Sequence, residues 1–341
     1  MSVTGTGTET APLLTLSDER WPIAGSFVIS RGAKTEAHVI LARITQTLAD
    51  GRTVVGQGEA VPYARYGETV ADSLKALEAM VPLVAEGLTS QGLLSAMAPG
   101  AARNALDCAL IDLEAKRSGQ PAWRTLGLRE PAPAVTAETI SLGPPEEMEA
   151  KARALANRPL LKIKVGGDDP ITRVTAVRQG APDSKLIVDA NEGWAAEDLP
   201  ALLAAMADLS VDLIEQPLPA DADEALEGIN SPVPLCADES VHTAEDLPRL
   251  ARRYGLVNIK LDKTGGLTAA LTLADAAEAQ GMGIMVGCML ATSLAMAPAL
   301  LLADRAAFVD LDGPVLLAKD RSPGLDFAQG IVSPPAPALW G

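Results

Sequence analysis

Short apolar runs alternate with stretches of helical periodicity along the chain from about residue 133 onward. The expected strands cover 135–142, 160–165, 185–190, 211–215, 233–238, 256–261, 283–287 and 307–311. The expected helices include 146–157, 171–181, 195–208, 243–254 and 267–280. The candidate strand ends recur about every 25 residues, at Thr139, Lys164, Asp189, Glu215, Asp238, Lys260, Gly287 and Asp310. Such a repeat predicts parallel strands joined by helices.

Two parallel architectures fit this alternation. A doubly wound open sheet gathers its functional groups at one point, where the strand order reverses. A barrel instead brings the carboxyl ends of all its strands to one mouth. Because nearly every expected strand ends in a functional side chain, we favour an α/β fold with a TIM-like (β/α)7β barrel.

The preceding part of the chain shows a different pattern. Residues 11–60 alternate apolar and polar positions and predict a β-meander with turns near 31–34 and 49–52. Helical stretches follow at about 70–88 and 101–118, and the second is apolar around much of its circumference, as in a buried helix. Strands followed by helices predict an α+β domain.

Proline-rich sequence marks the expected domain boundaries. Pro131-Ala132-Pro133 separates the meander and its helices from the strand–helix repeat, and prolines gather again near the end. We expect an α+β domain over 1–132, with about the first 12 residues disordered, and the barrel over 133–318. The segment 319–341 is expected to pack back on the first domain.

Composition and charge exclude several classes of function. No apolar run approaches the roughly 20 residues of a membrane span, and the polar start lacks a signal-peptide pattern. A net charge of −16 argues against nucleic-acid and membrane partners. With two histidines, the chain offers little for a histidine-centred zinc site or a Ser-His-Asp triad. Three widely spaced cysteines fit reduced thiols in the cytoplasm.

Three acidic side chains end successive expected strands: Asp189, Glu215 and Asp238. In a barrel they would converge, and three carboxylates so close repel one another unless a cation lies between them. Oxygen ligands favour Mg²⁺, with Mn²⁺ as the alternative. Each acid taken alone fits a solvated loop residue, whereas the three at this spacing predict a metal site.

Three lysines accompany the acids. Lys162 and Lys164 alternate with aliphatic residues on the second expected strand, and Lys260 ends the sixth. A lysine acts as a base when its pKa is lowered, as burial near another cation achieves. The alternative is that Lys162 and Lys164 pair with carboxylates, which would raise their pKa. Two bases on opposite sides of a metal suit removal of a proton α to a carboxylate and its return on the other face, that is, racemisation or epimerisation.

The ordered set of motifs resembles the muconate-lactonizing subgroup of the enolase superfamily from about residue 20 to residue 320. The motifs are Lys162-Ile-Lys164, Asp189-Ala-Asn191, Glu215-Gln-Pro217, Asp238-Glu-Ser240 and Lys260-Leu-Asp-Lys263-Thr-Gly-Gly266. Asp310-Leu-Asp312 resembles the Asp-x-Asp of dipeptide epimerases, where the pair binds the α-ammonium group of the substrate. The stretches 62–68, 100–107 and 263–267 are similar to the L-Ala-D/L-Glu epimerases of bacterial murein peptide recycling.

The resemblance implies roles for the acids and lysines. One Mg²⁺ would bind per subunit through the three acidic strand ends. Lys164 and Lys260 would be alternate acid and base, and Lys162 would tune its neighbour. Two carboxylates at Asp310 and Asp312 also suit a ligand with a fixed cation, such as a free N-terminus. The alternative is an aspartate pair that forms a turn before Gly313.

The resemblance also implies that the first domain caps the barrel and that its loops select the substrate. A glutamyl side chain would need a basic partner there, for which we rank Arg31 first, Lys34 second and Arg65 third. Further substrate contacts are implied for Thr139 and for the stretch at Cys288 and Met289, although the last two fit core positions equally well.

We therefore predict Mg²⁺-dependent epimerisation of L-Ala-D-Glu to L-Ala-L-Glu by 1,1-proton transfer through an enediolate. The nearest alternative is another activity of the subgroup: a different dipeptide epimerase, a cycloisomerase or an o-succinylbenzoate synthase. Asp310 and Asp312 argue against the last two, whose substrates have no ammonium group. A non-catalytic binding protein would be expected to lack a lysine or an acid. The partner is a small dipeptide, and the sequence leaves a homo-oligomer open.

Overall fold

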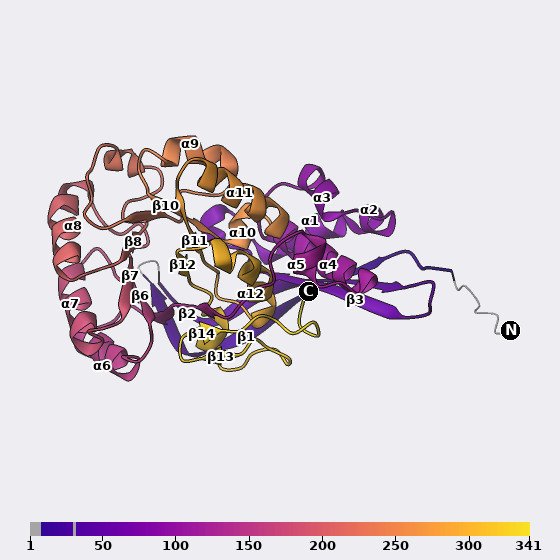
Figure 1. The fold of residues 1–341 in the computed structure, drawn as a ribbon, viewed down its shortest axis with the longest axis horizontal. Helices are drawn as coiled ribbons and strands as arrows, with labels where there is room; N and C mark the ends of the chain where they lie inside the picture. Colours follow the sequence, from indigo (N-terminus) through magenta and orange to yellow (C-terminus); the bar gives the residue numbers. More distant parts are fainter. Residues whose placement is uncertain (1–7, 30–31) are drawn as a thin grey trace.

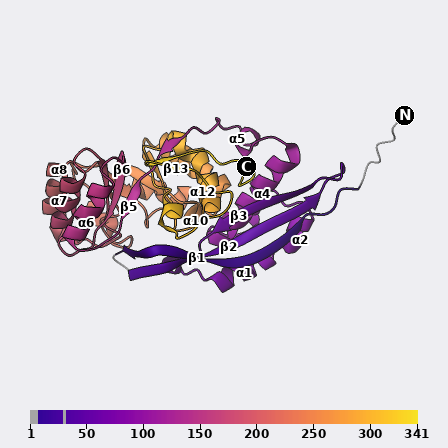
Figure 2. The ribbon, with the colours of Figure 1, turned by 90° about the horizontal axis from the view of Figure 1, so that it is seen from below.

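The computed structural model describes residues 8–29 and 32–341. Figure 1 shows a barrel of strands surrounded by helices, beside a long sheet that is backed by further helices. In the turned view this sheet runs along one side of the molecule and reaches the barrel (Figure 2). Within the first 12 residues, the structure describes 8 to 12, and the Thr10 amide donates a 2.9 Å hydrogen bond to the Thr47 carbonyl. The domain boundaries at 132 and 318 stay a prediction.

The long sheet is an antiparallel meander, in agreement with the alternating pattern. β1 (Leu13–Ile29) pairs with β2 (Gly32–Thr47), and β2 pairs with β3 (Thr53–Ala60). The turn expected over 31–34 extends too far along the chain, because Ala33 and Lys34 are paired residues of β2, opposite Val28 and Phe27.

Helices follow the meander. They are η1 (Ala64–Tyr66), α1 (Val70–Glu78), α2 (Val81–Ala85), α3 (Ser90–Ala96), α4 (Ala101–Ser118) and α5 (Ala122–Thr125). The single helix expected over 70–88 is wrong. Pro82 has no amide hydrogen and lies in the first turn of α2, where a continuous helix would need that hydrogen bond. The helix expected over 101–118 is confirmed, and α3 was not expected.

Helix α4 lies between the sheet and the barrel. On its sheet side, a Cβ atom at Gly56 would lie 2.2 Å from the Ala109 carbonyl oxygen, and one at Gly58 would lie 2.1 Å from that of Ala105. Only glycine permits this close approach of β3 to the helix. The buried composition of α4 thus reflects contacts on both of its sides.

The barrel is an eight-stranded parallel sheet in sequence order. Its strands are β5 (Glu138–Ile140), β6 (Leu160–Lys164), β7 (Lys185–Asp189), β8 (Leu213–Glu215), β9 (Leu235–Ala237), β10 (Leu256–Ile259), β11 (Gly283–Val286) and β12 (Phe308–Val309). The Ala137 amide donates to the Val309 carbonyl at 2.8 Å, which joins the two edges of the curled sheet. The predicted α/β class with a TIM-like barrel is confirmed. Every strand ends within one residue of its candidate strand-end residue, although β5, β10 and β12 end two residues before their expected ranges do.

Helices surround the strands. They are α6 (Pro145–Ala154), α7 (Pro170–Gly180), α8 (Leu199–Asp208), α9 (Leu247–Leu250), α10 (Leu261–Thr264), α11 (Leu267–Ala279) and α12 (Ser293–Ala299). Turns of 3-10 helix are η2 (Ala196–Asp198), η3 (Asp223–Leu226), η4 (Ala244–Asp246), η5 (Leu300–Arg305) and η6 (Gly313–Leu316). The helix expected over 243–254 is reduced to η4 and α9.

The end of the chain contacts α4. The Trp340 side chain is buried, and its Nε1 donates to the Cys108 carbonyl at 3.0 Å. The Gly341 amide donates to Asp112 Oδ1 at 2.7 Å. A small sheet joins β4 (Ala134–Val135), β13 (Phe327–Ala328) and β14 (Ile331–Val332). Over the described ranges, no helix has the length and apolar character needed to cross a membrane.

Candidate active site at the carboxyl ends of the barrel strands

The predicted acids and lysines gather at one end of the barrel. Lys164, Asp189 and Glu215 are the last residues of β6, β7 and β8 and are direct neighbours across the sheet. Asp238 and Lys260 each stand one residue beyond the end of β9 and β10. All five side chains are buried. The parallel register therefore brings together residues that are far apart in sequence.

Lys162 lies at the centre of the acidic cluster. Its Nζ is 2.7 Å from Glu215 Oε2, 2.8 Å from Asp310 Oδ2 and 3.1 Å from Asp189 Oδ2. Lys164 reaches the same oxygen of Asp189 at 2.5 Å. The alternative reading of these two lysines, that they pair with carboxylates, is therefore what the structure shows.

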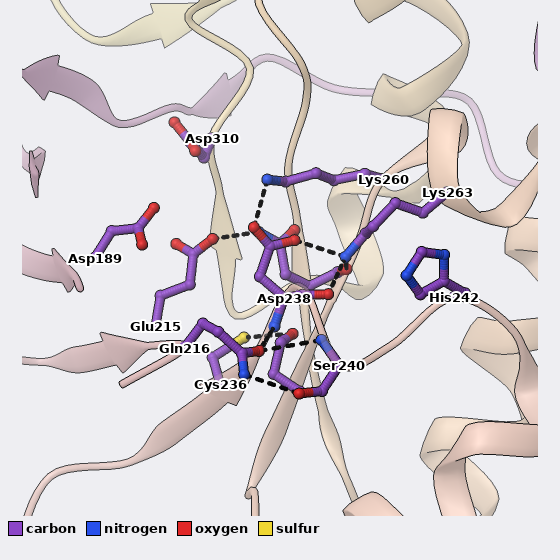
Figure 3. A network of polar contacts seen from close by, with 12 residues as sticks. Asp189, Glu215, Gln216, Cys236, Asp238, Ser240, His242, Lys260, Lys263 and Asp310 are labelled. Atoms are coloured by element: carbon purple, nitrogen blue, oxygen red, sulfur yellow. Dashed lines mark hydrogen bonds and ion pairs between the residues drawn. The ribbon is translucent and has the colours of Figure 1, made fainter. Parts of the chain in front are cut away.

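Asp238 receives two further lysines. Lys260 Nζ lies 2.6 Å from Asp238 Oδ2, and Lys263 Nζ lies 2.6 Å from Asp238 Oδ1. Figure 3 shows both side chains reaching this carboxylate. Asn258 donates its Nδ2 to Glu215 Oε1 at 2.8 Å. The cluster is thus a buried network of ion pairs between lysines and carboxylates.

The pKa values of the acids diverge. Burial, followed by the charge of the nearby Asp189, raises the pKa of Glu215 to about 7. Burial also disfavours the Asp189 carboxylate, but Lys164 and Lys162 outweigh it and hold its pKa below the ordinary value. At Asp238, Lys260 and Lys263 likewise outweigh burial and hold the pKa well below the ordinary value. Glu215 is thus the acid whose charge is least compensated.

The lysines show the cost of this pairing for a base. Burial, the largest influence, would lower the pKa of Lys260, but Asp238, Glu215 and Tyr66 together outweigh it and raise that pKa well above the ordinary value. At Lys162, Asp310 and Glu215 outweigh burial in the same way. The expected lowering of the base's pKa is thus not found at Lys260, because a full carboxylate lies against its ammonium group.

Asp310 and Asp312, which follow β12, face the same cavity. Asp312 Oδ2 accepts a 2.6 Å hydrogen bond from the Thr139 amide, and burial, followed by the charge of Asp310, raises the pKa of Asp312 to about 7. Asp310 Oδ1 is buried, and within the described part of the chain no donor reaches it. A buried acceptor without a partner is costly, so this oxygen is suited to receive a donor from a ligand.

A pocket opens over the cluster, and the predicted Thr139, Cys288 and Met289 line it. Lys34 also lines the pocket, with its Nζ 4.7 Å from the centre of the Tyr63 ring. Arg31 lies outside the described residues. Arg65 is instead paired with Glu192 at 2.7 Å, at the edge of the site.

Leu290, from the stretch expected at Cys288 and Met289, lines the pocket as well. Several other lining residues were not assigned a role from sequence: Phe27, Tyr63, Tyr66, Asn191, Glu239, Gly313 and Leu316. Lys263 and Asn258 were missed as contacts of the acids. Asn258 stands two residues before Lys260 on the same strand, so strand alternation could have placed it on the same face. Lys263 had no such signal, because it belongs to a helical turn.

The three acids at the strand ends are candidate ligands of a metal ion. Across residues 8–29 and 32–341, no three His, Cys, Asp or Glu side chains form a ready-made site, because ammonium groups contact the acids. The donor chemistry nevertheless fits a hard divalent cation, since Asp189, Glu215 and Asp238 offer buried carboxylate oxygens from three adjacent strands.

Comparison with protein families agrees with this geometry. The profile of the mandelate racemase and muconate lactonizing enzyme N-terminal domain matches residues 13–127. The profile of the enolase C-terminal domain-like family matches residues 147–336. The chain belongs to the enolase superfamily. The superfamily resemblance inferred from the motifs is therefore confirmed.

Two relatives within the enolase superfamily are nearly equal in similarity. The L-Ala-D/L-Glu epimerase of Escherichia coli is 46% identical over 92% of this chain and 97% of its own length. The N-acetyl-D-glutamate racemase of a Pseudoalteromonas species is 47% identical over 87% of this chain and 95% of its own. Both names describe inversion at a glutamate carbon.

Solved structures of the superfamily are similar as well. An enolase family member from Agrobacterium tumefaciens with homology to dipeptide epimerases, solved with bound sodium and L-Ala-L-Glu, is 53% identical with a TM-score of 0.93 and covers 97% of this chain and 100% of its own. The dipeptide epimerase of Methylococcus capsulatus, in complex with Mg and L-Arg-D-Lys, is 29% identical with a TM-score of 0.84 over 96% and 98% of the two chains.

Proposed function

We propose that the protein is an isomerase that interconverts L-Ala-D-Glu and L-Ala-L-Glu. The observation that carries the proposal is the placement of two buried lysines, Lys164 and Lys260, four strands apart in the eight-stranded barrel and facing one pocket. A carbon held between them can lose a proton to one lysine and gain a proton from the other. Similarity to the L-Ala-D/L-Glu epimerase of Escherichia coli supports this reaction.

Each half of the reaction follows from the position of one lysine. The neutral amine of one lysine removes the α-proton of the glutamyl residue, and the ammonium group of the other donates a proton to the opposite face. Lys162 contacts three carboxylates. Its positive charge would offset part of the negative charge that these carboxylates present to Lys164. The two lysines exchange roles when the reaction runs backwards.

Asp189, Glu215 and Asp238 would hold one Mg²⁺, with Mn²⁺ as the alternative. When bound, the ion would take up the charge that develops on the substrate carboxylate and would neutralise the carboxylates that now raise the pKa of Lys162 and Lys260. Related dipeptide epimerases are known with Mg, which supports the choice.

Asp310 and Asp312, which follow β12, would select a substrate with an ammonium group. Asp310 and Asp312 are buried, line the pocket and have a spare acceptor at Asp310 Oδ1. A free N-terminus provides donors and a positive charge for this pair. The Thr139 amide donates a hydrogen bond to Asp312. Cys288 and Met289 line the same pocket.

Lys34 would receive the glutamyl carboxylate. It is the basic side chain of the cap that lines the pocket among the described residues, and Arg31, our first-ranked partner, stands three positions before it. Arg65 is less suited because Glu192 occupies its guanidinium group. We further propose a role in murein peptide recycling in the cytoplasm, where the three free cysteines would stay reduced.

Racemisation of N-acetyl-D-glutamate is the second candidate, favoured by the 47% identity to such a racemase. That substrate has an acetyl group in place of the alanyl residue and therefore lacks the ammonium group. A buried aspartate pair would face it without gaining an ion pair, so Asp310 and Asp312 favour the dipeptide.

The test is incubation of the purified protein with L-Ala-D-Glu, L-Ala-L-Glu and N-acetyl-D-glutamate, each with Mg²⁺ and with a chelator, followed by chiral chromatography. We expect Mg²⁺-dependent interconversion of the two dipeptides and much slower reaction of the N-acetyl compound. Faster reaction of N-acetyl-D-glutamate would establish the second candidate, and reaction of none would remove both.

A further inference from the structure

Lys260 is carried by a short turn and not by a strand. It stands one residue beyond β10 and is the N-cap of α10, whose amides at Lys263 and Thr264 donate to the Lys260 carbonyl at 3.0 Å and 3.1 Å. The position of the Lys260 backbone therefore depends on where α10 lies.

Asp262, within α10, joins this turn to the first part of the chain. Its Oδ1 accepts a 3.0 Å hydrogen bond from the Val61 amide and another, also 3.0 Å, from Asn104 Nδ2. Val61 directly follows β3, and Asn104 lies in α4. All three residues are buried. A single carboxylate oxygen thus connects the Lys260 turn to two elements of the cap.

Arg103 holds the other end of the turn. Its Nη2 donates to the Thr264 carbonyl at 2.6 Å and its Nε to the Gly265 carbonyl at 2.9 Å. Gly265 has a φ of +74°, and a Cβ atom there would lie 2.6 Å from Arg103 Nε. Glycine is needed at this position for both reasons. Asn104 and Arg103 are consecutive on α4, so one turn of that helix secures both ends of α10.

Among the described residues, the backbone of Lys164 has no hydrogen bond to the cap of this kind, although its Nζ lies 6.0 Å from the centre of the Phe27 ring in β1. Lys164 lies inside β6, and the ladder to β7 fixes its backbone within the barrel. Displacement of α4 would therefore move the support of Lys260 but leave the β6 ladder unchanged.

We propose that Asp262, assisted by Asn104 and Arg103, is a positioning residue that sets the place of Lys260 but not that of Lys164. This inference rests on the proposed two-base reaction. Because a base displaced by about 1 Å can lose roughly 10²-fold in rate, the effect is measurable for each base separately.

The test isolates each lysine by deuterium exchange in D₂O with Mg²⁺. In a Lys164→Ala background, exchange of the glutamyl α-proton reports on Lys260, and in a Lys260→Ala background it reports on Lys164. We expect Asp262→Ala to slow the Lys260 exchange about 10- to 100-fold and the Lys164 exchange less than about 3-fold. Asp262→Asn keeps the Oδ1 acceptor and should restore the Lys260 exchange to within about 3-fold of its parent.

Asp107→Ala is the matched control. Asp107 is a buried acid of α4 that accepts hydrogen bonds from the Thr268 amide and hydroxyl at 2.9 Å and 2.6 Å, so its loss also weakens the contact with the barrel. Because α10 keeps its hydrogen bonds to Val61, Asn104 and Arg103, this variant should slow each exchange less than about 3-fold. If Asp262→Ala does not fold, Asn104→Ala removes one of the two donors and gives the same comparison.

Equal slowing of both exchanges by Asp262→Ala, or no slowing, would overturn the inference while leaving the proposed reaction intact. Absence of exchange in the protein with both lysines present would overturn the proposed reaction and the inference with it. The two failures are therefore distinguishable.

Discussion

Lys164 and Lys260 face one pocket from different kinds of support. Lys164 is the last residue of β6 and lies in a parallel ladder with β7. Lys260 lies beyond β10, on a turn that hydrogen bonds with the cap through Asp262 and Arg103. The backbone of Lys164 is thus held by a barrel ladder, with Phe27 of β1 6.0 Å from its Nζ, whereas the turn that carries Lys260 is hydrogen bonded to the cap.

The difference teaches how a cap can influence chemistry on a scaffold that is otherwise rigid. The loop after β3 carries Tyr63 and Tyr66 into the pocket, and its first residue, Val61, donates to Asp262. In the proposed reaction, the same cap loop would contact the substrate and support the turn of one of the two bases. The backbone of the other base, Lys164, is held by the β6–β7 ladder.

Replacement of each lysine should give the largest effect. Lys164→Ala and Lys260→Ala should each lower the rate of epimerisation about 10²- to 10⁴-fold, because each removes one proton-transfer group. Each variant should still exchange the α-proton of one epimer, and the two variants should retain opposite epimers. Proton NMR in D₂O measures both quantities. Retention of the same epimer by both variants would break the comparison.

Asp312→Asn should have a smaller effect that does not distinguish the lysines. Loss of an ion pair with the substrate ammonium group should raise the KM for L-Ala-Glu about 10- to 100-fold, equally for both epimers. Steady-state kinetics on each epimer is the measurement. N-acetyl-D-glutamate is the control substrate, because it has no ammonium group and should not lose rate; an unchanged KM for the dipeptides would remove the proposed role.

Lys34→Gln should act on the side chain of the substrate. We expect a KM about 10-fold higher for L-Ala-L-Glu and little change for L-Ala-L-Leu, which has no side-chain carboxylate. Arg65→Gln is the matched control, since Arg65 already pairs with Glu192, and it should affect both dipeptides alike. Equal effects of Lys34→Gln on the two dipeptides would exclude the role.

Asp262→Asn should change how stability depends on pH, with an effect of a few kcal/mol. Burial raises the pKa of Asp262 from 3.8 to about 7, against the hydrogen bonds from Val61 and Asn104 and with help from the charges of Glu68 and Glu59. Between about pH 4 and 7 the folded protein holds this proton and the unfolded chain does not. The free energy of unfolding of the wild type should therefore fall as pH rises through this range.

The variant has no such proton, so its stability relative to the wild type should grow between about pH 4 and 7 and then stay constant. A raised pKa of this size corresponds to an advantage on the order of a few kcal/mol. Urea unfolding at pH 5 and pH 8 measures it. A difference between variant and wild type that does not change with pH would show that Asp262 titrates normally.

Much of the barrel could be predicted because its signal is local. Each strand is a short apolar run, and its last polar residue marks the end within one position, so the acids and lysines fall at one mouth once the strands are parallel. The meander and α4 are visible for the same reason. The break between α1 and α2 depends on Pro82, whose position in an apolar stretch was readable but was not used.

The contacts that support Lys260 could not be predicted from the sequence. The hydrogen bond from Val61 to Asp262 joins residues 201 positions apart, and the contact of Asn104 with Asp262 joins residues 158 positions apart. No periodic pattern records such a pair. The charge state of Lys260 was likewise missed, because it depends on the distance to Asp238 and not on residue type alone.

The most direct test of two bases is the early course of the reaction in D₂O with Mg²⁺, followed by mass spectrometry of both epimers. Two lysines on opposite sides predict deuterium in the product and protium in the unreacted substrate, starting from either L-Ala-D-Glu or L-Ala-L-Glu. Protium carried from the α-carbon of the substrate into the product would mean that a single base serves both faces and would contradict the account.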